Sequence, residues 1–156
     1  DVYKRQVLKL LNTLRPSDAI FGKKDYQQLA IIKRLVRDLG VPVRIHGVDT
    51  VREPDGLALS SRNIMLKPEH RRDASRIHRA LLCARDIRET GEQRPEVYLK
   101  IARKHLVENA PSEMEIEYLE IIDPETLVPL AKVAGPALLA TAATYDEVRL
   151  IDNIEI

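Results

Sequence analysis

The first third of the chain carries the pattern that most constrains its fold: a strand, a helix and a second strand joined by short loops. An apolar run at residues 19–21 ends at Gly22, as expected for a buried strand. From Asp25 onward, apolar residues recur at spacings of three and four, which is the period of a helix with one buried side. Gly40 ends that pattern, and apolar and polar residues then alternate over 41–46 as in a strand. Two strands joined through a helix by short loops predict a right-handed crossover in a parallel sheet.

The start of the chain differs from this unit. Apolar residues over 7–14 indicate a helix that stops before Pro16, because the residue preceding a proline disfavours helical geometry. Residues 1–6 fit the helix pattern poorly, and the chain does not begin with Met. We interpret residues 1–6 as a cloning or assembly scar and the chain as part of a longer protein.

The second half of the chain has another order of elements. Helices are expected from Pro68 to a stop at Gly91 and again from Pro95, followed by strands over 114–118, 137–145 and 147–154. Helices followed by a run of strands predict a small α+β unit with an antiparallel sheet. The segment 51–67 between the halves lacks periodicity, which predicts a long ordered loop. Loops of this length are often functional. We predict an α/β domain over 1–64 and a small C-terminal domain over 65–156.

Composition narrows the classes of function. Twenty-five basic residues against 24 acidic ones leave a formal net charge of +1, unlike the surface of a dedicated nucleic-acid binder. One cysteine, Cys83, excludes a disulfide framework, and no histidines are spaced as metal ligands, so no metal site is expected. No apolar run reaches the roughly 18 residues of a membrane span, and the polar N-terminus is unlike a signal peptide. We expect a cytoplasmic protein with no nucleic-acid partner and no membrane.

A first candidate site lies over residues 22–28, where the first strand meets the helix. The N–H groups of a helix start and the ammonium groups of Lys23 and Lys24 would lie at the carboxyl edge of the sheet, where anions bind in open α/β sheets. The alternative is an ordinary cap, in which Asp25 accepts hydrogen bonds from first-turn amides and Gln28 reaches back. Spacing alone favours the cap, and both interpretations stay open here.

A second candidate site lies in the irregular segment, at Ser60, Ser61 and Arg62. Two hydroxyls and a guanidinium are suited to phosphate oxygens, because arginine offers a bidentate fork. The alternative is a serine-capped turn with a solvated arginine, which spacing alone favours.

Together, the two segments closely resemble the pantothenate synthetase (pantoate–β-alanine ligase) family. The shared motifs are GKKDYQQL at 22–29 and VREPDGLALSSRN at 51–63, supported by LVRDL at 35–39 and LIDNIE at 150–155. The resemblance runs from about residue 7 to residue 156. Two such motifs in this order and at this separation are specific.

The resemblance implies an α/β fold: the C-terminal part of a Rossmann-like nucleotide-binding domain of the HIGH superfamily, followed by a small α+β domain. It implies an ATP-dependent ligase that adenylates pantoate, releases pyrophosphate and then joins the acyl group to the amine of β-alanine, giving pantothenate and AMP. The implied substrates are therefore ATP, pantoate and β-alanine. Mg²⁺ is expected with ATP, and a homodimer is expected for the full-length protein.

The family's ATP-contacting residues correspond to positions in both segments. They match Gly22, Lys23, Lys24, Asp25, Val51, Leu59, Ser60, Ser61 and Arg62, with Val51 meeting the adenine through its backbone. Gln28 matches a pantoate-binding glutamine. The implied catalytic residues are Lys24, Ser60, Ser61 and Arg62, with Lys24 stabilising the negative charge of adenylation and not acting as a base. Because the second segment has no apolar stripe, we expect it to become ordered over ATP.

Two departures from the family pattern bear on activity. Leu59 stands where the family usually has Met, a swap of similar volume. The family's N-terminal half, with its histidine-bearing signature, has no counterpart here, so we expect the isolated chain to be inactive. The alternatives are another adenylate-forming nucleotidyltransferase with a different acid substrate, a tRNA-contacting piece of a synthetase, and a non-catalytic α/β fragment. Glutamates in the second half argue against the tRNA alternative.

Overall fold

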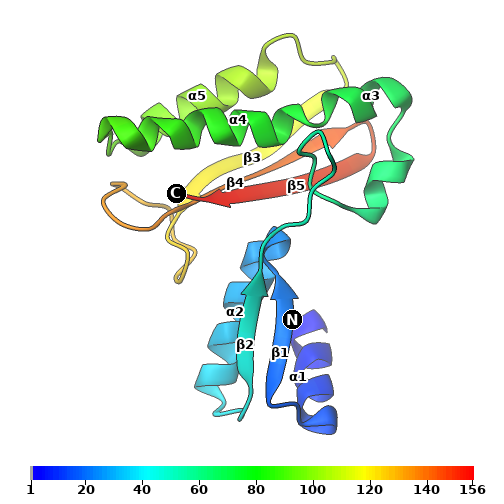
Figure 1. Ribbon diagram of the computed structural model, residues 1–156, viewed down its shortest axis with the longest axis vertical. Coiled ribbons are helices and arrows are strands. Elements are labelled where there is room, and N and C mark those ends of the chain that lie inside the picture. Colours follow the sequence, from blue (N-terminus) through cyan, green and yellow to red (C-terminus); the bar gives the residue numbers. More distant parts are fainter. Residues whose placement is uncertain (1) are drawn as a thin grey trace. The chain divides into compact units, whose positions relative to one another are not determined.

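The computed structural model describes residues 2–156, apart from the side chain of Val2, and the chain forms two compact units (Figure 1). The first unit ends at Thr50 and the second spans Val51–Ile156. This boundary lies earlier than the one predicted at residue 64, because Leu57 is buried in the core of the second unit.

Helix α1 (Val2–Leu14) starts earlier than the sequence predicts. Of the residues interpreted as a scar, Asp1 lies outside the described residues, whereas residues 2–6 continue the helix toward its N-terminus. The helix ends before Pro16, as predicted, with Arg15 at a φ of 48°.

The strand–helix–strand unit consists of β1 (Asp18–Gly22), a 3-10 turn (Lys23–Asp25), α2 (Tyr26–Asp38) and β2 (Arg44–Val48). The two strands are parallel, which confirms the predicted parallel pairing, and their register pairs Asp18 with Arg44 and Gly22 with Val48. Both strands therefore have their carboxyl ends at the same edge. Gly40, with a φ of +60°, takes the left-handed conformation predicted for the residue that ends the helix pattern.

One face of this sheet is covered and the other is open. Ala19, Phe21 and Ile45 pack with residues of α1 and α2 around a core of Leu11, Ile32 and Val36. Ile20 points to the other face and is 69% exposed, so the prediction of a buried β1 is wrong. A strand is buried on both faces only where both are covered, and within this unit the helices pack on one.

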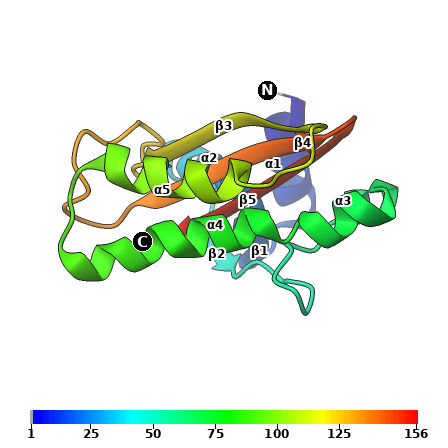
Figure 2. The same cartoon turned by 90° about the horizontal axis from the view of Figure 1, so that it is seen from above.

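The second unit places helices over an antiparallel sheet. It contains a 3-10 helix (Ser61–Met65), α3 (Pro68–Asp73), α4 (Arg76–Arg85), a 3-10 turn (Asp86–Thr90), α5 (Pro95–Val107), β3 (Met114–Ile122), β4 (Leu138–Tyr145) and β5 (Val148–Glu155). The strand order is β3-β4-β5, and both pairings are antiparallel, as predicted. The single helix expected over 68–91 is divided into three pieces. α4 and α5 lie side by side over one face of the sheet (Figures 1 and 2). A parallel unit followed by an antiparallel α+β unit is the predicted fold class.

Candidate active site

The first candidate segment, residues 22–28, joins β1 to α2 at the carboxyl edge of the parallel strands. The Asp25 side chain accepts a hydrogen bond from the Gln28 N–H at 3.3 Å, so the predicted helix cap is present. A single cap satisfies only part of the first turn, because a helix start has four N–H groups without partners inside the helix. The cap therefore leaves the start of α2 able to interact with an anion.

The charged and polar side chains of this segment are held in different ways. Lys23 Nζ lies 3.0 Å from Asp49 Oδ1, just beyond the end of β2. Lys24 and Gln28 are half-buried. Gly47 of β2 allows α2 to approach closely, since a Cβ added there would lie 2.8 Å from Leu29 Cδ2. The packing of α2 on β2 thus fixes the position of this segment.

The second candidate segment begins with a small hairpin in the second unit. The Leu59 N–H donates to the carbonyl of Val51 at 2.9 Å, and the Glu53 N–H donates to the carbonyl of Leu57 at 2.8 Å. Leu57 and Ala58 are buried. These backbone hydrogen bonds and buried side chains hold the hairpin at the start of the segment, and its ordering over ATP stays a prediction.

The serine-rich part of the segment follows directly. Ser60 Oγ accepts a hydrogen bond from the Arg62 N–H at 3.2 Å and caps the 3-10 helix, so the predicted serine-capped turn is present. Ser61 and Arg62 are exposed. Asn63, which is buried, donates through Nδ2 to the carbonyl of Ala58 at 3.2 Å. An exposed hydroxyl and an exposed guanidinium are thus displayed on a short, anchored turn.

The structure brings the members of each segment together within one unit. Gly22, Lys23, Lys24, Asp25 and Gln28 belong to the first unit, whereas Val51, Leu59, Ser60, Ser61 and Arg62 belong to the second.

Sequence reasoning missed the side chains that anchor the second segment. Arg52 forms a bidentate ion pair with Asp152 of β5, and Asp55 pairs with Arg71 of α3 at 2.6 Å. The Arg71 contact lowers the pKa of the Asp55 carboxyl below its usual value. Arg52 and Asp152 belong to the motifs at 51–63 and 150–155. They are 100 positions apart in sequence, so the sequence does not show that they form a pair.

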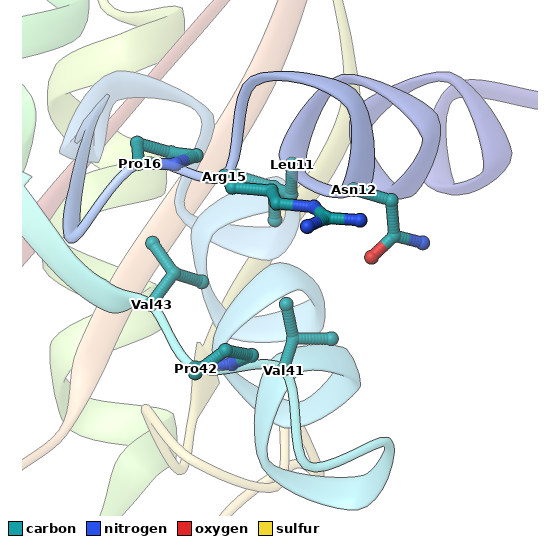
Figure 3. Close-up of a pocket in the computed structure, with 7 residues that line it drawn as sticks. All are labelled: Leu11, Asn12, Arg15, Pro16, Val41, Pro42 and Val43. Atoms are coloured by element: carbon teal, nitrogen blue, oxygen red, sulfur yellow. The ribbon is translucent and has the colours of Figure 1, made fainter.

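The first unit also holds a cavity of about 380 Å³ (Figure 3). It lies beside the end of α1 and the start of β2, and it is lined by Leu11, Asn12, Arg15, Pro16, Val41, Pro42 and Val43. None of the predicted site residues contributes to it. Its mainly apolar lining is unlike a phosphate-binding site.

Two features are absent from the part of the chain that the structure describes. Within residues 2–156, no three His, Cys, Asp or Glu side chains are grouped so that they could hold a metal ion. No helix in the same part is long and apolar enough to cross a membrane.

Comparison with known proteins places both segments in one family. The family model described as pantoate-beta-alanine ligase matches residues 4–155. The pantothenate synthetase of Akkermansia muciniphila is 52% identical over 148 residues, which are 95% of this chain and 52% of that protein.

Solved structures agree with the sequence matches. The crystal structure of pantothenate synthetase from Thermus thermophilus superimposes with a TM-score of 0.88 at 45% identity, covering 95% of this chain and 52% of that one. The pantoate-beta-alanine ligase of Francisella tularensis, complexed with beta-gamma ATP and β-alanine, gives a TM-score of 0.63 at 30% identity. That match covers 95% of this chain and 47% of the other.

The chain spans about half the length of the curated relatives it matches. Nearly all of its own length is matched, by a family model and by proteins about half identical to it. The chain therefore belongs to the pantoate–β-alanine ligase family.

Proposed function

We propose that the complete protein containing this chain condenses pantoate with β-alanine, using ATP and passing through a pantoyl adenylate. The observation that carries this proposal is the family match over residues 4–155, which includes both candidate segments. The ligand set of the Francisella ligase, beta-gamma ATP and β-alanine, supports the same chemistry.

In the first step, a carboxylate oxygen of pantoate attacks the α-phosphorus of ATP, and the bond from that phosphorus to pyrophosphate breaks. Negative charge builds on the phosphate oxygens and on the leaving group, so preorganised cations and hydroxyls lower the barrier. We assign this role to Lys24, Ser60, Ser61 and Arg62. The remaining ATP contacts are assigned to Gly22, Lys23, Asp25, Val51 and Leu59.

In the second step, the amine of β-alanine attacks the acyl carbon of the adenylate. A C–N bond forms, the bond to AMP breaks and the nitrogen loses a proton. Gln28 lies in the first turn of α2, where its amide can hydrogen-bond a hydroxyl or the carboxylate of pantoate. The protein's further contribution is to align the reactants and to shelter the adenylate from water.

Mg²⁺ belongs to this proposal as an ion that arrives with ATP. Such an ion is bound by the phosphates together with one or two protein carboxylates. A homodimer of the complete protein is proposed from the resemblance alone. A cytoplasmic location is proposed from the single cysteine, which suits a reducing compartment.

The test is product formation by the complete polypeptide of the reading frame that contains this chain. Purified protein is given ATP, pantoate and β-alanine, and each substrate is omitted in turn. The proposal predicts pantothenate and AMP in equal amounts only when all three are present. Product with another acid in place of pantoate, and none with pantoate, would instead support a different adenylate-forming enzyme.

A further inference from the structure

The hairpin of the second segment is tied to the sheet by one buried ion pair. Arg52 Nη1 lies 2.7 Å from Asp152 Oδ2, and Arg52 Nη2 lies 2.9 Å from Asp152 Oδ1. The side chain of Asp152 is 3% exposed and that of Arg52 is 20% exposed. This bidentate geometry fixes the direction of the guanidinium as well as its distance.

The Arg52 guanidinium also makes a hydrogen bond inside the hairpin. Arg52 Nη1 donates to the carbonyl of Gly56 at 3.0 Å, across the turn of the hairpin. Asp152 Oδ1 in turn accepts from the Asn153 N–H at 2.8 Å, which orients the carboxylate on β5. A continuous series of polar contacts therefore runs from β5 through the Asp152 carboxylate and the Arg52 guanidinium to the hairpin.

A histidine of α4 packs on the other side of the turn. Gly56 has a φ of +93°, and a Cβ added there would lie 3.0 Å from His78 Cδ2. His78 Nδ1 is buried and lies 3.6 Å from Asp152 Oδ2, too far for a hydrogen bond, and it has no hydrogen-bond partner within residues 2–156. The turn is thus confined between Arg52 and His78.

Other contacts already keep the hairpin folded. Leu57 and Ala58 are buried, and Asp55 is paired with Arg71 of α3. Arg52 differs from these residues because it is adjacent to Val51. The carbonyl of Val51 accepts a hydrogen bond from the N–H of Leu59, and Leu59 directly precedes Ser60. The ion pair therefore acts where both strands of the hairpin lead into the proposed nucleotide contacts.

We propose that Arg52 and Asp152 are positioning residues, which set the backbone of Val51 and the turn at Ser60–Arg62 for ATP. This inference rests on the proposed function. A buried ion pair adds little stability over an apolar pair of equal size, but it fixes one arrangement of the groups it joins. A misplacement of about 1 Å in a site can cost on the order of 10²-fold in rate, so such an anchor matters for catalysis.

The test combines steady-state kinetics with hydrogen exchange on the complete polypeptide. The double variant Arg52→Gln/Asp152→Asn removes both charges together, so that no buried carboxylate is left unpaired. Its control is Arg149→Gln, also on β5, which removes an exposed ion pair to Glu117 of β3. We expect the double variant to raise the KM for ATP about tenfold, to leave the KM for β-alanine within about twofold, and to speed exchange of the Leu57 and Leu59 amides. The control should change none of these.

An unchanged KM for ATP in a folded double variant would overturn the positioning role. If the double variant does not fold, Arg52→Lys serves instead, because lysine keeps the charge but cannot form the bidentate contact. It should raise the KM for ATP about threefold without changing the KM for β-alanine, and no change would overturn the proposal. A wild-type protein that makes no pantothenate contradicts the proposed function. The amide exchange still decides then whether the ion pair anchors the hairpin.

Discussion

Lys24 is the residue whose proposed role is most specific, and it lies in the 3-10 turn between β1 and α2. Replacing it with alanine removes one preorganised positive charge from the adenylation step. We expect Lys24→Ala to slow single-turnover pyrophosphate release by about 10²–10³-fold, with little change in pantoate affinity. The matched control is Lys33→Ala, which replaces an exposed lysine of α2 and should leave the rate unchanged. A Lys24→Ala rate within a few-fold of wild type would show that Lys24 merely belongs to a solvated helix start.

Gln28 and Arg62 are expected to serve different ligands. Gln28 is half-buried on a helix that is anchored by Leu29 and Ile32, whereas Arg62 is exposed on a capped turn. An amide suits the hydroxyl groups of pantoate, and a guanidinium suits phosphate. We expect Gln28→Ala to weaken pantoate binding about tenfold with normal ATP binding, and Arg62→Ala to do the reverse. Calorimetric titration of each variant with each ligand measures this, with Gln27→Ala and Arg72→Ala as exposed controls. Equal loss of one ligand in both variants would contradict the division.

We expect His78 to make the free energy of unfolding depend on pH. Burial, and to a smaller degree Arg52, lower its pKa below the usual 6.5, while Asp152 acts in the opposite sense and Arg85 adds to the lowering. Below about pH 6.5 the unfolded chain therefore binds more protons at this position than the native protein does. The free energy of unfolding falls as the pH decreases toward the native pKa, and the loss is complete below it.

His78→Gln removes this titration. We measure the free energy of unfolding of both proteins in urea. We expect the value of the variant to increase relative to that of wild type as the pH is lowered from about 7.5 to about 5. Parallel pH profiles for the two proteins would show that His78 does not contribute.

At the scale of elements, one arginine joins two helices of the second unit. Arg76 at the start of α4 donates to the carbonyls of Leu106, Glu108 and Asn109 at 3.2, 2.8 and 3.0 Å, and so caps the end of α5. Its Nε also lies 2.7 Å from Asp73 Oδ2, which accepts a 2.8 Å hydrogen bond from Tyr145. Burial and this bond to Asp73 raise the pKa of Tyr145, so the hydroxyl remains a donor.

Without Arg76, the largely buried carboxylate of Asp73 loses its ion pair, and the three carbonyls at the end of α5 lose their hydrogen-bond donor. We expect Arg76→Ala to lower the free energy of unfolding by about 3 kcal/mol, measured by urea denaturation. Arg85→Ala, at the other end of α4, breaks only an exposed pair with Asp86 and should cost less than about 0.5 kcal/mol. Similar losses for the two variants would contradict the cap.

The elements with a clear period were predictable, and those set by distant contacts were not. The stripe at Leu29, Ile32 and Val36 predicts α2, and the buried side of that helix matches it. Leu39, in the same pattern, is 59% exposed because it lies beyond the last helical residue. The exposure of Ile20 depends on which face the helices cover, which no local pattern encodes.

The candidate site shows the same limit. The cap at Asp25 and the turn at Ser60 follow from local spacing and are present. The side chains that anchor the loop were not predicted, because they come from distant elements, namely Asp152 of β5 and Arg71 of α3. Such pairs depend on tertiary structure, and one sequence does not reveal them.

At the scale of the whole molecule, each unit has its own small core and contributes its own candidate segment. The chain matches about half the length of its curated relatives, so the proposed reaction belongs to the complete protein. We propose that the complete protein activates pantoate as an adenylate before β-alanine takes part.

Isotope exchange between labelled pyrophosphate and ATP, measured in the complete polypeptide with Mg²⁺, tests this order of steps. Formation of the adenylate is reversible and releases pyrophosphate, so label enters ATP only when the acid is activated on the protein. We predict exchange that requires pantoate, proceeds without β-alanine and is depressed by Arg62→Ala. Exchange that needs β-alanine, or that proceeds equally well without pantoate, would contradict the account.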